Sequence, residues 1–221
     1  MSEIIRAVVF DMDGLMFNTE DVYTLTGTEL LRRRGLLFTE ELKDALMGLP
    51  PEPCFNTIIR WHGLSEDWTT LASESDNIYV GLLTEHLAVM PGLMELLSAL
   101  ERAEIPKAIA TSSSRKLTDV CLEPFGLTDR FQFILTSEDI TLGKPNPEIY
   151  LLAASRFGIR PSEMLVLEDS HNGCRAAAAA GAFAVAVPGS HSRRHDFSTA
   201  RLVIESLADP RLYKALGLDR E

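Results

Sequence analysis

Short apolar runs that end in polar clusters recur along this chain. The first run, formed by Ile5 and residues 7–10, is followed directly by Asp11-Met12-Asp13-Gly14. Because residues 7–10 are apolar on both faces, they predict a strand in the middle of a covered parallel sheet. Residues i and i+2 of a strand point the same way, so Asp11 and Asp13 can converge on one spot beyond its end. Two unpaired carboxylates so close would repel each other, so the pair indicates either a bound divalent cation or a solvated junction between strand and loop.

Residues 20–87 have a different pattern, in which apolar side chains recur at helical spacing and no strand pattern interrupts them. Pro50, Pro51 and Pro53 predict a loop within this region. Four helices are predicted, at residues 20–34, at 39–47 with Gly48 as its end, around 55–59 with Gly63 as its end, and at 65–87. The region therefore predicts an all-helical insert that begins after the carboxylate pair.

From Met90 onward, helical and strand patterns alternate. The alternation implies a doubly wound parallel sheet of the Rossmann-like α/β class with right-handed crossovers. Alanines 176–180 predict a helix that lies close against this sheet, because small side chains permit a close approach. The predicted strands are residues 106–110, 133–135, 164–167, 183–187 and, more weakly, 202–204; the predicted helices are 91–102, 115–123, 148–157 and 175–180.

Composition narrows the class of protein further. The chain has 221 residues, 46% of them hydrophobic, with a net charge of −11. Such an acidic chain is not expected to bind nucleic acid, which requires a basic face. Its three widely spaced cysteines form no CxxC pair and predict neither a disulfide framework nor a zinc site. The start of the sequence lacks a signal pattern, and no apolar run is long enough to span a membrane, so we expect a cytoplasmic protein. We also expect a monomer.

Chemistry-bearing side chains follow the predicted strands. In an open parallel sheet, ligands bind beyond the carboxyl ends of the strands. The clusters that fall there are Asp11 with Asp13, Thr111 with Ser112, Glu168 with Asp169, and the single Lys144. Carboxylates that suit Mg²⁺, small hydroxyls and one lysine are the groups that handle a phosphoryl group. Each cluster alone is weak evidence, because Ser112 could cap a helix and Lys144 could lie in an ordinary loop.

Together these residues resemble the haloacid dehalogenase superfamily of aspartyl-phosphate hydrolases. Asp11-Met12-Asp13-Gly14-Leu15 resembles its first motif, Thr111-Ser112 its second, Lys144 its third and Glu168-Asp169 its fourth. The longer strings at residues 143–150 and 167–173 resemble the β-phosphoglucomutase-like branch, and residues 187–204 resemble the pseudouridine-5'-phosphatase group. The resemblance implies a core domain at residues 1–16 and 88–221, with a helical cap domain at residues 17–87.

The resemblance also implies a role for each matching residue. Asp11 would be the nucleophile, and Asp13 would be the general acid and base. Mg²⁺ would be held by Asp11, the Asp13 backbone carbonyl and Asp169, with Glu168 beside it or bound through water. Thr111, the backbone at Ser112, and Lys144 would bind the phosphate of a small phosphorylated metabolite, such as a sugar phosphate or a nucleoside monophosphate.

Single residues distinguish a phosphatase from two other enzyme classes on the same fold, dehalogenases and phosphomutases. Dehalogenases lack the second aspartate, because a halide leaving group needs no proton, so Asp13 disfavours them. β-Phosphoglucomutases have a cap histidine where Tyr23 falls, and a lysine and an arginine near the cap glycine, where this chain has Met47 and Pro51. Hydrolysis is therefore favoured, with a phosphomutase as the alternative.

Overall fold

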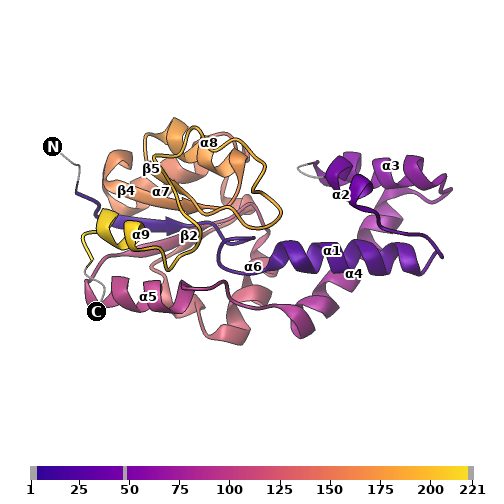
Figure 1. Ribbon diagram of the computed structural model, residues 1–221, viewed down its shortest axis with the longest axis horizontal. Coiled ribbons are helices and arrows are strands. Elements are labelled where there is room, and N and C mark those ends of the chain that lie inside the picture. Colours follow the sequence, from indigo (N-terminus) through magenta and orange to yellow (C-terminus); the bar gives the residue numbers. More distant parts are fainter. Residues whose placement is uncertain (1–3, 47–48, 219–221) are drawn as a thin grey trace. The chain divides into compact units, whose positions relative to one another are not determined.

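A parallel sheet forms the centre of the computed structural model, which describes residues 4–46 and 49–218. Within these residues the sheet has six strands in the order β3-β2-β1-β4-β5-β6, and every neighbouring pair is parallel (Figure 1). This arrangement confirms the predicted doubly wound α/β fold. The strands are β1 (Ala7–Phe10), β2 (Lys107–Ala110), β3 (Ile134–Leu135), β4 (Met164–Glu168), β5 (Phe183–Ala186) and β6 (Leu202–Val203).

Helices cover both faces of the sheet. Helices α7 and α8 lie on one face, and α5 lies on the other (Figure 1). The helices around the sheet are α5 (Leu93–Arg102), α6 (Arg115–Leu122), α7 (Glu148–Phe157), α8 (His171–Ala180) and α9 (Pro210–Ala215), with short 3₁₀ turns η1 (Glu123–Phe125), η2 (Thr128–Arg130), η3 (Ser137–Asp139) and η4 (Pro161–Glu163). None of the helices in the described part of the chain is long and apolar enough to cross a membrane.

Strand β1 lies between β2 and β4 and is fully buried, as its two apolar faces predict. The alanine-rich helix α8 packs on the sheet through Ala176 and Ala177, which share one core cluster with Val9 of β1 and Val166 of β4. Helix α8 therefore packs against the sheet through its alanines, as predicted. This packing holds the end of β1 and the start of α8 at the same edge of the sheet.

The chain divides into two compact units, Met1–Asn18 with Ala88–Glu221, and Thr19–Leu87. The second unit contains α1 (Thr19–Arg32), α2 (Glu40–Leu46), α3 (Pro51–His62) and α4 (Trp68–His86). Its apolar cores are built around Leu30 with Leu71 and Ile78, and around Leu31 with Leu42 and Ile58.

Two helices begin earlier than the sequence predicted. Helix α3 starts at Pro51 and not after the prolines. The N–H groups of the first helical turn have no partner within the helix, so proline, which has no N–H, is tolerated there. Helix α8 starts at His171 and not near Arg175, because the Ser170 side chain caps it. The predicted end of the second helix, at Met47 and Gly48, lies outside the described residues.

The chain leaves and re-enters the first unit at neighbouring positions. The Asn18 N–H donates to the Ala88 carbonyl at 3.1 Å, and the Ala88 N–H donates to Asn18 Oδ1 at 2.7 Å. One residue further on either side, Phe17 and Val89 form an antiparallel bridge. The two connecting segments are therefore hydrogen-bonded to each other where they join the first unit.

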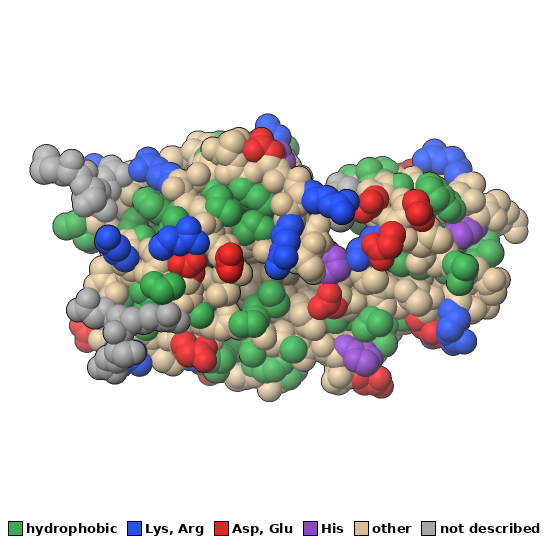
Figure 2. Space-filling view, viewed as in Figure 1, with side chains coloured by type: hydrophobic (Ala, Val, Ile, Leu, Met, Phe, Trp, Pro, Cys, Tyr) green, Lys and Arg blue, Asp and Glu red, His purple; other side chains and the backbone are tan. Residues whose placement is uncertain are grey.

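Acidic and basic side chains lie interspersed on the face of the molecule drawn in Figure 2, and neither kind forms a large patch of its own there. The net charge of the whole chain is −11. A protein that binds nucleic acid gathers lysine and arginine on one surface, and this face does not do so.

Candidate active site

Asp11 lies directly after β1, with its side chain only 9% exposed. Its N–H donates to the Leu167 carbonyl of β4 at 2.9 Å, and its Oδ1 accepts a hydrogen bond from Lys144 Nζ at 2.5 Å. Burial raises the pKa of Asp11 well above its usual value, although the Lys144 ammonium acts in the opposite direction. The site therefore holds a carboxylate that needs more positive charge than Lys144 supplies.

Asp13 is turned toward different partners from those of Asp11. Its Oδ2 accepts hydrogen bonds from Thr111 Oγ1 at 3.1 Å and from Ser113 Oγ at 2.8 Å. Its Oδ1 is buried and has no hydrogen-bond partner among the described residues. Gly14 follows with a φ of 75°, a left-handed conformation that glycine adopts without strain, and turns the chain out of the site.

Lys144 connects two of the other clusters that the sequence places at the strand ends, through Asp11 and Glu168. In addition to Asp11, its Nζ donates to Glu168 Oε1 at 2.7 Å and to the Ala110 carbonyl of β2 at 3.0 Å. Burial alone would lower the pKa of Lys144, but the charges of Asp11 and Glu168 outweigh this effect and raise it well above its usual value. The charged ammonium form of Lys144 is therefore favoured at the site.

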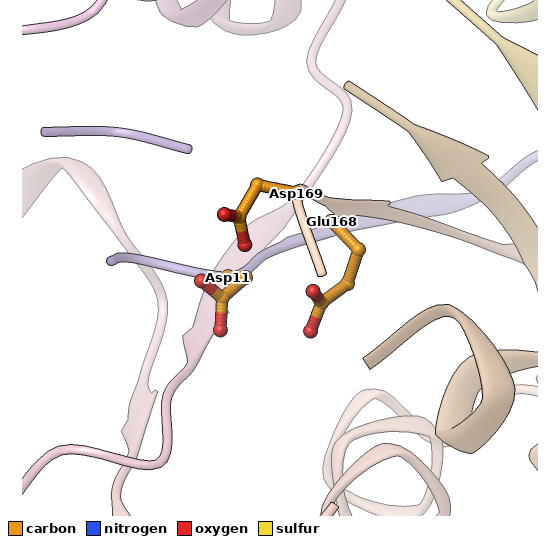
Figure 3. Close-up of side chains that lie close together, drawn as sticks. All are labelled: Asp11, Glu168 and Asp169. Carbon is orange, nitrogen blue, oxygen red and sulfur yellow. The ribbon is translucent and has the colours of Figure 1, made fainter. Parts of the chain in front are cut away.

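Three carboxylates gather at the carboxyl ends of β1 and β4. Asp11, Glu168 and Asp169 are all buried, and each offers a carboxylate oxygen that lies within 4.8 Å of those of the other two (Figure 3). With Lys144 as their charged neighbour, the formal charges sum to two negative charges, from three carboxylates and one ammonium. Buried carboxylates with surplus negative charge are oxygen donors that suit a divalent cation.

The structure brings the predicted residues Asp11, Asp13, Thr111, Lys144, Glu168 and Asp169 to the same edge of the sheet. Ser112, by contrast, is exposed, and the hydroxyl that reaches Asp13 belongs to the next residue, Ser113. Ser113 could have been suspected from the run of serines at 112–114, but no local pattern selects it.

Sequence reasoning also missed the residues that surround Glu168. Tyr150 Oη donates to Glu168 Oε1 at 2.6 Å, and both the N–H and Oγ of Ser170 donate to Oε2. Gly173 leaves room for this carboxylate, because a Cβ at that position would lie 1.8 Å from it. Tyr150 lies in α7, six residues after Lys144. This spacing does not indicate that its side chain reaches Glu168.

Several known proteins are similar to this chain in sequence and in fold. Residues 8–187 match the family described as haloacid dehalogenase-like hydrolase. The probable pseudouridine-5'-phosphatase of Drosophila melanogaster is 34% identical over 217 residues, which cover 94% of each chain. The phosphorylated carbohydrates phosphatase of Thermotoga maritima is 29% identical over 176 residues, covering 80% of this chain and 82% of that protein. The crystal structure of CbbY from Rhodobacter sphaeroides in complex with phosphate has a TM-score of 0.81 and 26% identity, covering 97% of this chain and 100% of that chain.

The chain therefore belongs to the haloacid dehalogenase-like hydrolase family, which confirms the resemblance seen in its motifs. The matched region includes β1 except for Ala7, all of β2 to β5, and every residue of the site described above. Within this family, the chain is an enzyme of the phosphatase type.

Proposed function

We propose that the protein is a Mg²⁺-dependent phosphatase that hydrolyses a small phosphorylated metabolite through an aspartyl-phosphate intermediate on Asp11. The observation that carries this proposal is the buried Asp11 carboxylate, with Lys144 Nζ 2.5 Å from its Oδ1 and the carboxylates of Glu168 and Asp169 next to it. A lysine beside a buried carboxylate can neutralise an incoming phosphate dianion, which Asp11 alone would repel.

The donor set supports Mg²⁺ as the metal. The surplus of two negative charges in a buried place is costly unless a divalent cation neutralises it. Asp11, Asp169 and the backbone carbonyl of Asp13 would hold the ion, with Glu168 beside it. When bound, Mg²⁺ would neutralise charge on the phosphate and keep Asp11 ionised against the effect of burial on its pKa.

In the first step, Asp11 attacks phosphorus, and the bond between phosphorus and the ester oxygen breaks. Asp13 gives its proton to the leaving oxygen, so that the product leaves as an alcohol. Hydrogen bonds from Thr111 and Ser113 to Oδ2 fix the Asp13 carboxyl group, so that Oδ1 is the atom to carry this proton. Lys144 and the backbone at Ser112 hold the phosphoryl oxygens.

In the second step, water attacks the phosphorus of the aspartyl phosphate. Asp13, now a carboxylate, takes a proton from this water, and the bond between phosphorus and the Asp11 oxygen breaks. Phosphate is released, and both aspartates return to their starting states. One carboxyl group can serve in both steps because the first step leaves it deprotonated.

Two substrate classes are proposed, sugar phosphates and nucleoside monophosphates. The similarity to a phosphorylated carbohydrates phosphatase supports the first class, and the similarity to a probable pseudouridine-5'-phosphatase supports the second. The proposal also assigns residues 17–87 the role of a cap domain, which would recognise the part of the substrate other than the phosphate.

The proposal is tested by measuring phosphate release over a panel of sugar phosphates and nucleoside monophosphates, with and without Mg²⁺. Asp11→Asn should lower kcat by at least about a thousandfold, because it removes the nucleophile. Asp129→Asn, an exposed aspartate in η2, is the matched control and should retain wild-type turnover. Full activity of Asp11→Asn would overturn the proposal, and isomerised sugar phosphate without released phosphate would favour a phosphomutase instead.

A further inference from the structure

Glu168 accepts hydrogen bonds on both of its carboxylate oxygens. Its side chain is fully buried, and its Oε1 accepts hydrogen bonds from Tyr150 Oη at 2.6 Å and from Lys144 Nζ at 2.7 Å. Its Oε2 accepts hydrogen bonds from Ser170 Oγ at 2.8 Å and from the Ser170 N–H at 3.2 Å. A carboxylate has about four lone-pair positions, so these donors fill them.

The backbone of α8 lies directly against the Glu168 carboxylate. Gly173, in the first turn of α8, lies against it so closely that a Cβ would come within 1.8 Å of the carboxyl group. The carboxylate is therefore fixed by donors on both oxygens and by the backbone of α8. A group held in this way is suited to hold another group in place.

The group that Glu168 holds is Lys144. The same ammonium lies 2.7 Å from Glu168 Oε1, 2.5 Å from Asp11 Oδ1 and 3.0 Å from the Ala110 carbonyl oxygen, so Glu168 is one of its three anchors. The Tyr150 ring also contacts this lysine, with Nζ 5.1 Å from the ring centroid. The hydroxyl of Tyr150 and its ring therefore act on the same lysine by two routes, through Glu168 and directly.

We propose that the Tyr150 hydroxyl is a positioning group for the phosphatase reaction, acting through Glu168 to hold the Lys144 ammonium against the Asp11 nucleophile. This inference rests on the proposed function. Without the hydroxyl, one lone pair of a buried carboxylate loses its donor, and Glu168 draws Lys144 toward itself and away from Asp11. Glu168 thus serves the reaction mainly as an anchor of Lys144.

Tyr150→Phe separates the two routes, because it keeps the ring over Lys144 and removes only the hydrogen bond to Glu168. We expect kcat to fall about tenfold, with KM changed less than about twofold, because the contact between Lys144 and Asp11 matters most when Asp11 attacks phosphorus. Tyr213→Phe, which removes the hydroxyl of a buried tyrosine in α9, should leave both constants unchanged. Wild-type kcat in Tyr150→Phe would overturn the proposal.

A double-mutant cycle tests the route through Glu168. If Tyr150 acts through Glu168, the double variant Tyr150→Phe/Glu168→Gln should have the kcat of Glu168→Gln alone, within about twofold. Losses that multiply would show that the hydroxyl acts by another route and would overturn the proposal. Mg²⁺ binding, measured by calorimetry, should differ less than about threefold between wild type and Tyr150→Phe; a tenfold change would assign the hydroxyl to the metal instead.

A crystal structure of Tyr150→Phe provides a readout that needs no turnover. Displacement of Lys144 Nζ from Asp11 is the expected result, and an unchanged distance to Asp11 would contradict the proposal. Absence of phosphatase activity in the wild-type protein over the whole panel would refute the proposed function, whereas the crystal structure would still decide whether Tyr150 positions Lys144.

Discussion

Gly173 lies at the point where helix α8 passes the buried Glu168 carboxylate. A Cβ at this position would meet the carboxyl carbon and Oε1 of Glu168, both at 1.8 Å. Contacts this short force a shift of the carboxylate or of the helix. The absence of a side chain at residue 173 is therefore part of what places Glu168, and with it Lys144.

We predict that Gly173→Ala destabilises the protein by about 1–3 kcal/mol and lowers kcat. Alanine is intrinsically favoured over glycine in a helix by about 1 kcal/mol, so a net loss would come from the clash with Glu168. Urea unfolding and phosphate release provide the two measurements. Gly189→Ala is the control, because a Cβ there would meet no atom within 4 Å. A Gly173→Ala protein as stable and active as wild type would contradict the prediction.

At this scale, the sequence predicted the charged residues of the site but not their partners. Asp11, Lys144 and Asp169 could be placed together because they follow strands that end at one edge of a sheet. The donors Ser113 and Tyr150 could not, because their contacts depend on the path of the loop after β2 and on which side of α7 faces β4. Neither property is encoded in a local pattern.

Among the elements, α5, β2 and η2 are linked by one carboxylate. Glu101 of α5 forms ion pairs with Arg130 of η2 at 2.7 Å and with Lys107 of β2 at 2.9 Å. The hydrogen bond from Arg130, together with Lys107, lowers the pKa of Glu101 to about 2. Its ionised form is therefore favoured in the folded protein.

We predict that Glu101→Gln lowers the free energy of unfolding at pH 7 and that its difference from wild type shrinks on acidification. Because the pKa is lower in the folded state, the contribution is complete above about pH 4.5 and is lost as the pH falls toward about 2. The difference should be small, because the Glu101 side chain is 40% exposed and solvent screens its charge. Urea unfolding at pH 7, 4 and 2 measures it, and a difference that does not depend on pH would refute this explanation.

The strands could be predicted more accurately than the helix starts. Strands β1 and β4 are continuous apolar runs because both of their faces are buried, and such runs are visible in the sequence. The start of α3 was misjudged because Pro51 and Pro53 indicate a loop as readily as a first helical turn. The cap of α8 by Ser170 was hidden within a string of polar site residues.

For the molecule as a whole, Mg²⁺ should act as a stabilising ligand. A cation that binds the folded site but not the unfolded chain raises the free energy of unfolding by about 2.7 kcal/mol at a hundred times its Kd. We predict that saturating Mg²⁺ raises Tm by on the order of 5–10 °C relative to EDTA. Thermal unfolding followed by circular dichroism measures the shift.

Two controls distinguish site binding from general screening of the net charge of −11. NaCl at the same ionic strength should reproduce only a minor part of the shift. Asp169→Asn should abolish the Mg²⁺-specific part, because it removes a carboxylate of the candidate metal site. An equal rise in Tm with NaCl, or in Asp169→Asn, would show that the cation does not bind at this site.

The hydrogen bonds between Asn18 and Ala88 have a consequence for how this chain could diversify. Because the connecting segments are joined at their base, the 69 residues Thr19–Leu87 begin and end at neighbouring positions of the first unit. The entropic cost of closing such an insertion grows only slowly with its length, by about 0.6 kcal/mol for each doubling. We predict that the inserted helices form a module that evolution or a designer could exchange while the strands and the residues at their carboxyl ends stay in place.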